Sequence, residues 1–184
     1  MVGLIIIIVV VVILVLIAIA TYNGLVRIRT RVDNAWAQID VQLKRRHDLI
    51  PNLIETVKGY AAHERETLDS VVQARNQAVS ANSPEQQGQA ENLLTQSLGK
   101  LFALAEAYPN LKANQNFLEL QEELTATEDK VAYARQFYND SVQSYNARIA
   151  TIPAKFFAGP MGYKAREYFQ TDAPEDRDVP KVQF

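Results

Sequence analysis

The chain has 184 residues, enough for one domain with an accessory segment, and its 19 basic and 21 acidic residues leave a formal charge of −2 at pH 7. This balance lacks the basic footprint of a nucleic-acid-binding protein, so we expect no nucleic-acid partner. The absence of cysteine excludes disulfides, thiolate catalysis and lipoprotein attachment. Glycine and proline number seven each, and the middle of the chain is rich in residues that favour helices, so we predict an all-α fold.

The N-terminal segment is apolar without interruption over residues 4–20. Extended to Val26, it makes about 34 Å of helix, which exceeds a hydrocarbon core of about 30 Å. We therefore predict a transmembrane anchor over residues 1–26, with Tyr22 at the membrane interface. A cleaved signal peptide is the alternative, because the A-I-A sequence at 18–20 resembles a cleavage site, but no basic residue precedes the run.

The first charged residues follow the apolar run on its C-terminal side, at Arg27, Arg29 and Arg31. By the positive-inside rule they predict a single-pass membrane protein with its N-terminus outside and its helical domain in the cytoplasm. Each guanidinium adds about 1 kcal/mol of attraction near an anionic lipid surface. We therefore assign Tyr22 and these three arginines to the membrane interface and expect the lipid bilayer as a partner.

A single apolar stripe runs through the next segment at spacings of three, four and seven, which predicts a helix. Its members are Val32, Trp36, Ile39, Leu43, Ile50, Leu53 and Val57. The stripe continues through Pro51, which lacks an N–H and disfavours helical geometry at the preceding residue, so we predict a bent, near-continuous helix. After the first helix, which runs from Val32 to the proline, a second helix is predicted from about Asn52 to Val79, with Gly59 as a local weak point.

Two more helices follow in the sequence. Ser83 and Pro84 have the chemistry of an N-cap and a first helical position, and they predict a helix over residues 85–107. The stripe over residues 117–149 keeps a near-heptad spacing, which requires partners that supercoil left-handedly. The predicted architecture after the anchor is an elongated antiparallel four-helix bundle over residues 27–152.

The remaining residues, 153–184, differ in composition and form a predicted C-terminal tail that is partly ordered. An acidic stretch occupies residues 172–176. The tail is also unusually aromatic, with Phe156, Phe157, Tyr163, Tyr168, Phe169 and Phe184. Two interpretations stay open: the tail docks on the bundle, or it presents a peptide to a partner.

Several stretches resemble the LemA family of bacterial membrane proteins. They are YN at 22–23, AW at 35–36, QIDVQLKRR at 38–46, DLIPNL at 48–53, AEAYPNLKAN at 105–114, LQEEL at 120–124, TEDK at 127–130 and ARQFYN at 134–139. The resemblance covers nearly the whole chain from residue 22. It implies an N-terminal anchor in the bacterial cell membrane and a helical domain, and it implies no activity.

The two histidines, His47 and His63, have no carboxylate or second histidine at a metal-ligand spacing such as H-E-x-x-H. We expect both to be solvated or to cap helices. No Gly-rich phosphate loop and no G-x-S-x-G elbow occurs in the sequence. The sequence therefore predicts a protein that is not an enzyme and has no cofactor, no metal and no catalytic residue.

Charged residues occupy or adjoin the apolar stripes at Arg46, Glu64, Arg75, Glu106 and Glu128. Carboxylates on facing helices can form a di-metal site, but that site requires Glu-x-x-His pairs, which this sequence lacks. We interpret the five residues as buried or half-buried salt-bridge partners that fix the register of the helices. A metal carrier or an enzyme with a cavity lined by Glu64, Glu106 and Glu128 is the rival hypothesis.

A helical domain fixed to a membrane at one end favours a structural role. We expect a non-enzymatic scaffold or adaptor that forms homo-oligomers and organises or shapes membrane with partner proteins. The alternative is an adaptor that delivers substrates or signals to a membrane protease or a sensor kinase through its C-terminal tail. Its partner would be a membrane or cytoplasmic protein that the sequence does not name.

Overall fold

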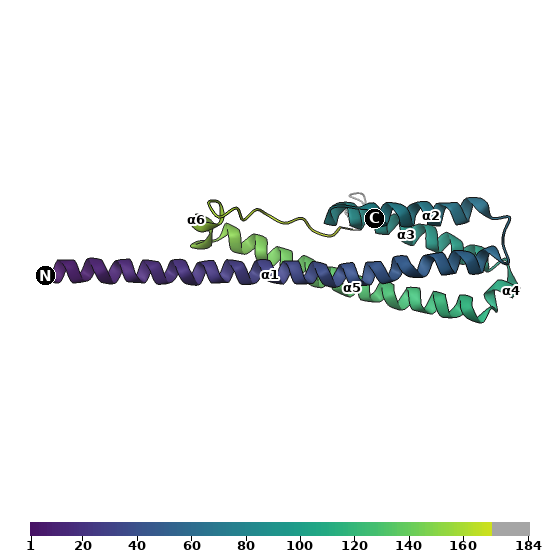
Figure 1. Cartoon of the computed structure of the whole chain (residues 1–184), viewed down its shortest axis with the longest axis horizontal. Coiled ribbons are helices and arrows are strands. Elements are labelled where there is room, and N and C mark those ends of the chain that lie inside the picture. The colour runs from purple at the N-terminus through teal and green to yellow at the C-terminus, as the bar shows by residue number, and fades with distance from the viewer. Residues whose placement is uncertain (171–184) are drawn as a thin grey trace, which may run out of the picture. The chain divides into compact units, whose positions relative to one another are not determined.

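The computed structural model describes residues 1–170, and every regular element in that range is a helix (Figure 1). The helices are α1 (Val2–Lys58), α2 (Arg65–Ser80), α3 (Pro84–Ala105), α4 (Pro109–Lys112), α5 (Gln115–Ala150) and α6 (Ala154–Ala158). The described chain divides into two compact units. Unit 1 comprises residues 1–38 and 136–166, and unit 2 comprises residues 39–135 and 167–170. The all-α prediction is confirmed.

Helix α1 runs for 57 residues and passes through Pro51 without a break, which confirms the predicted continuity. The predicted bounds of the second helix, from about Asn52 to Val79, are wrong, because α1 continues to Lys58 and the next helix begins only at Arg65. The backbone N–H groups of Tyr60 and Ala61 both bond the carbonyl of Val57, which closes the last turn. Gly59, which has poor helix propensity, lies at this break, and the chain restarts as α2 at Arg65.

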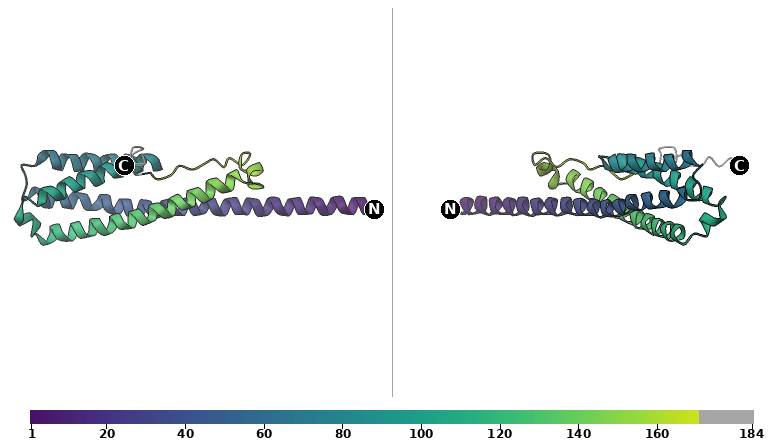
Figure 2. Two further views of the ribbon diagram at one scale, coloured as in Figure 1. Left: turned by 180° about the vertical axis from the view of Figure 1, so that it is seen from behind. Right: turned by 45° about the vertical axis from the view of Figure 1, so that its right-hand side comes forward.

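Unit 2 buries the stripes that the sequence predicts for its helices. Helices α2 and α3 lie side by side in both views of Figure 2. The core of this unit includes Ile50, Leu53 and Val57 from α1, Leu68, Val71 and Ala78 from α2, Leu94, Leu98 and Leu101 from α3, and Phe117 and Leu124 from α5. Removal of this apolar surface from water is the main force that assembles the unit.

The ends of α3 and α5 follow the local chemistry of the sequence. The Ser83 hydroxyl accepts a hydrogen bond from the Gln86 N–H at 3.2 Å, and Pro84 opens α3, so both assignments are confirmed. Helix α3 stops at Ala105, two residues earlier than predicted. At the next helix, the Asn114 side chain accepts from the Phe117 N–H at 3.0 Å and satisfies one of the free donors at the start of α5.

Unit 1 joins the first part of α1 to the last part of α5. Leu25 and Val32 of α1 and Val142 of α5 are buried, and the rings of Trp36 and Tyr138 lie 5.3 Å apart. Residues 1–17 are all exposed. By its length and composition, α1 is the described helix that could cross a membrane, and its apolar window is not buried inside the protein.

The described part of the tail is held by specific contacts within each unit. In unit 1, the Tyr145 hydroxyl donates to the carbonyl of Lys164 at 2.9 Å, and the Arg166 N–H donates to the Asn146 side chain at 2.9 Å. In unit 2, Phe169 is buried. Residues 163–170 therefore dock, and the acidic stretch at 172–176 lies outside the described residues.

Gly88 of α3 gives a direct test of this docking. A Cβ at position 88 would stand 1.8 Å from the carbonyl oxygen of Gln170. We expect Gly88→Ala to lower the free energy of unfolding by about 1–3 kcal/mol, because the backbone of residue 170 has to move. Urea unfolding of the full chain in mild detergent, followed by circular dichroism, measures this change.

Gly99, on the same helix, is the matched control because a Cβ there meets nothing within 4 Å. Gly99→Ala is expected to raise the free energy of unfolding by about 0.5–1 kcal/mol, through helix propensity alone. An equal gain for both substitutions would contradict the close approach of the tail to α3.

Candidate functional site

An ion pair buried in unit 2 joins α1 to α3. The Arg46 Nη1 atom lies 2.9 Å from Glu91 Oε2, and each side chain is only 3% exposed. Arg46 Nη2 also donates to the Thr95 hydroxyl at 2.8 Å. Glu128 of α5 approaches the same nitrogen at 3.6 Å from a half-exposed position. Arg46 therefore links three helices of the unit through one guanidinium group.

The second oxygen of the Glu91 carboxylate has its own partners. His47 Nε2 lies 2.6 Å from Glu91 Oε1, and Gln87 Nε2 donates to the same oxygen at 3.0 Å. Gln87 also donates to the carbonyl of Ala78 at 3.0 Å, and Arg75 donates to the carbonyl of His47 at 3.3 Å. These bonds add α2 to the set, so all four long helices of unit 2 meet at this cluster.

The prediction that His47 is solvated or caps a helix is wrong, because the residue is buried and contacts Glu91. Its position on α1, between the buried residues Leu43 and Ile50, turns it inward together with Arg46. The sequence analysis missed Glu91 altogether. Its spacing from Leu94, three residues further along the stripe of α3, was the available signal for a buried carboxylate.

The other predicted polar residues have separate partners. Glu64 accepts a hydrogen bond from the Tyr108 hydroxyl at 2.9 Å, and this bond raises the pKa of Tyr108 above its usual value. Glu106 pairs with Lys112 on the exposed surface. The structure thus brings Arg46 and Glu128 together, while Glu64 and Glu106 bond elsewhere. Among the described residues, no group of three or more His, Asp or Glu side chains is placed to hold a metal ion.

The bonds of the cluster fix the positions of the helices relative to one another. Both carboxylate oxygens of Glu91 accept bonds, and burial strengthens each of them electrostatically. Two hollows of about 340 and 200 Å³ flank the cluster, the first bordered by His47 and Arg75 and the second by Arg46 and Glu128. The arrangement holds helices at a defined register, since a shift of one helix would leave a buried charge without its partner.

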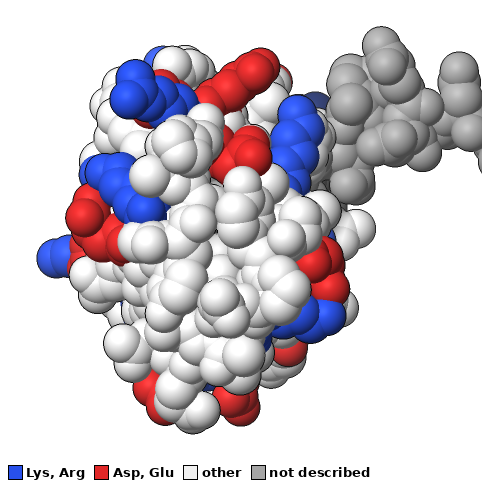
Figure 3. All heavy atoms as spheres, turned by 90° about the vertical axis from the view of Figure 1, so that its right-hand side faces the viewer, with Lys and Arg blue, Asp and Glu red and all other residues white. Residues whose placement is uncertain are grey.

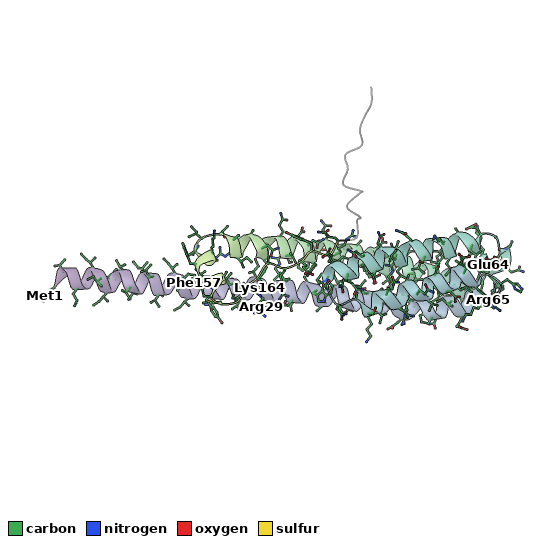
Figure 4. The ribbon with its side chains drawn as sticks, turned by 90° about the horizontal axis from the view of Figure 1, so that it is seen from above. Met1, Arg29, Glu64, Arg65, Phe157 and Lys164 are labelled. Atoms are coloured by element: carbon green, nitrogen blue, oxygen red, sulfur yellow. The ribbon has the colours of Figure 1, made fainter. Side chains whose placement is uncertain are left out.

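The predicted interface residues lie in unit 1. Tyr22 is exposed, and Arg29 stacks over Tyr163 with its guanidinium carbon 5.9 Å from the ring centre. Arg31 stacks in the same way over Phe137 at 5.3 Å. Figure 4 shows Arg29 and Lys164 near each other in this unit.

A groove of about 440 Å³ also belongs to unit 1. Its lining residues are Arg27, Thr30, Arg31, Asn34, Gln38 and Phe137. Two guanidinium groups, a hydroxyl and two amides give this groove the donors that suit the oxygens of a phosphate group.

The two units differ in charge. Unit 1 contains seven Lys or Arg residues and two Asp or Glu residues, which gives +5, whereas the sequence of unit 2 through residue 184 contains twelve and nineteen, which gives −7. On the face of unit 2 shown in Figure 3, blue and red side chains are intermixed. The basic excess therefore belongs to the unit that carries the apolar segment.

These features define a class of all-helical protein with one long apolar N-terminal helix that is able to anchor it in a membrane. The sequence model of the LemA family matches residues 35–184, and the chain belongs to this family. The resemblance noted from the sequence is thereby confirmed.

Three named proteins are similar to this chain in sequence. The magnetosome proteins MamQ 2 and MamQ 1 of Paramagnetospirillum magneticum are each 25% identical to it over 184 residues, which cover 86% of this chain and 68% of the relative. The protein LemA of Metamycoplasma hominis is 28% identical over 162 residues, which cover 85% of this chain and 72% of the relative.

The buried ion pair makes a quantitative prediction. We expect Glu91→Ala to lower the free energy of unfolding by about 3–5 kcal/mol, because the Arg46 guanidinium is left buried without its counter-charge. Glu55→Ala, which breaks an exposed pair with Lys58, is the control and should change it by less than about 0.5 kcal/mol. Urea unfolding of the full chain in detergent measures both.

The double variant Arg46→Met with Glu91→Leu tests the same interaction from the other side. Its loss of unfolding free energy should be smaller than the sum of the losses for the single variants Arg46→Met and Glu91→Leu, because neither charge is then buried without a partner. Additive losses would show that the two side chains do not interact in the folded protein.

Proposed function

We propose that this protein is a non-enzymatic, membrane-anchored scaffold or adaptor that associates with copies of itself and organises membrane with partner proteins. The observation that carries the proposal is the continuity of α1. One helix leads from an exposed apolar segment to Ile50, Leu53 and Val57 in the core of unit 2. Such a helix couples the position of a folded domain directly to the bilayer.

The orientation follows from charge. Arg27, Arg29 and Arg31 come directly after the apolar segment, and the rest of unit 1 is also basic. These residues support a topology with the N-terminus outside and the helical domain in the cytoplasm, at the inner face of a bacterial cell membrane. The convergence of α1, α2, α3 and α5 on the Arg46 cluster supports an antiparallel four-helix arrangement for that domain.

The names of two relatives support a role in a membrane assembly. Two relatives are named as magnetosome proteins, and we extend from this a role for the present chain in a bacterial membrane assembly. Its partners would be the bilayer, further copies of the chain and a membrane or cytoplasmic protein.

The mass of the assembly tests this proposal. We expect the full chain, extracted gently from membranes, to form a large and defined oligomer in mild detergent, as measured by light scattering. The mass should stay constant when the ratio of detergent to protein is raised, because specific contacts hold the copies together. A monomer at every ratio would contradict the scaffold and favour an adaptor with a single partner.

The adaptor alternative is now confined to a shorter segment. Because residues 163–170 are docked and Phe169 is buried, a free recognition peptide would have to lie within residues 171–184. Deletion of those residues should abolish capture of a protease or kinase partner while the helical content stays unchanged. Retention of the partner after this deletion would exclude a tail-based adaptor.

A further inference from the structure

The turn that follows α5 exposes three large apolar side chains, whereas Phe157 is half-buried. Ile152 is 72% exposed, Phe156 is 69% exposed and Met161 is 46% exposed. The small residues of α6, Ala154 and Ala158, are buried instead. A water-soluble surface normally shows the opposite distribution, and a cluster of exposed apolar side chains marks a site that contacts another apolar phase.

The position of this turn along α1 is fixed by contacts at both of its ends. Before the turn, near the end of α5, the Arg148 guanidinium lies 3.5 Å from where a Cβ on Gly24 would stand. After the turn, beyond α6, Tyr163 stacks against Arg29. Figure 4 shows Phe157 beside α1, between Met1 and Arg29. The turn therefore lies toward the apolar end of α1.

The part of α1 beside this turn is also the part where the hydrocarbon core of a bilayer would end. A hydrocarbon core of about 30 Å requires about 20 helical residues, so a core that begins near residue 4 ends near residue 24. Thr21 and Leu25 are buried at this level, and the Thr21 hydroxyl donates to the carbonyl of Ile17 at 2.7 Å. Its hydrogen bond is thus satisfied without water, as an apolar environment requires.

Charge around the turn fits the adjoining headgroups. Arg27 follows Gly24 by three residues, and Arg148 lies beside Gly24 in space. Lys155 is an exposed residue of α6 itself. Long basic side chains can place their stems along apolar surface and their charged ends among lipid phosphates.

We infer that the α5–α6 turn is a second membrane-inserting element, with Ile152, Phe156 and Met161 immersed in the acyl chains of the leaflet from which α1 emerges. The inference rests on the proposed membrane anchoring and extends it. Unit 1 then contacts the bilayer at two points, the spanning helix and the turn. Two contacts fix the rotation of unit 1 about the axis of α1, which a single spanning helix leaves free.

The absence of cysteine allows a test with a single label. A Phe156→Cys variant of the full chain, carrying an environment-sensitive fluorophore, is placed in vesicles of phosphatidylethanolamine and phosphatidylglycerol with nitroxide-labelled acyl chains. We expect several-fold stronger quenching than for the same label in a Leu118→Cys variant, an exposed apolar position on α5 in unit 2. A Leu14→Cys variant in the apolar segment reports the anchor itself.

Nitroxides at different depths along the acyl chains report how deeply each label lies in the bilayer. The label at position 156 should respond most to nitroxides near the headgroups, and the label at position 14 to those deep in the chains. Quenching at position 14 combined with none at position 156 would overturn the inference and leave the anchor intact.

Two further outcomes also overturn the inference. A label at position 156 that escapes both the lipid nitroxides and aqueous iodide would show that a second copy of the chain covers the turn. A label at position 14 that escapes the lipid nitroxides would remove the anchor, and with it the turn as a second contact.

Discussion

In the proposed function α1 begins in lipid and ends in a protein core, so one backbone must satisfy two different surroundings. In hydrocarbon, each N–H and C=O has to bond within the segment, which a helix achieves and an open loop does not. Because α1 is unbroken from Val2 to Lys58, no loop interrupts this helix where it leaves the membrane. Pro51, which removes the N–H that would bond the His47 carbonyl, lies well beyond the apolar segment, and Arg75 of α2 donates to that carbonyl at 3.3 Å instead.

The buried cluster of unit 2 solves a problem that apolar packing leaves open. Leucine and valine stripes tolerate small shifts of one helix past another, since any apolar neighbour is acceptable. Glu91 does not tolerate them, because its two oxygens accept bonds from Arg46, His47 and Gln87 at 2.6–3.0 Å. The cost of removing these charges from water offsets much of their attraction, so we assign the cluster a role in the register of the helices rather than in overall stability.

The sequence predicted the long helices because their apolar spacing is regular, and it predicted the start of α3 because Ser83 and Pro84 have specific cap chemistry. It wrongly continued the second helix through residues 59–64, since the apolar stripe continues across Gly59 and periodicity does not detect a turn that preserves its phase. The helical spacing of His47 and Glu91 placed both beside apolar stripes, but their pairing was missed because the two residues lie 44 positions apart in the sequence. Only the tertiary structure pairs them.

A net charge of −2 for the whole chain conceals two opposite parts. Unit 1, at +5, is attracted to an anionic leaflet by about 1 kcal/mol for each basic residue near the surface. The sequence of unit 2 through residue 184, at −7, is repelled within a Debye length of about 8 Å. The same lipid charge thus favours one unit at the headgroups and disfavours the other. The net charge of the whole chain therefore predicts no attraction to an anionic membrane, whereas the net charges of the two units predict attraction for unit 1 and repulsion for unit 2.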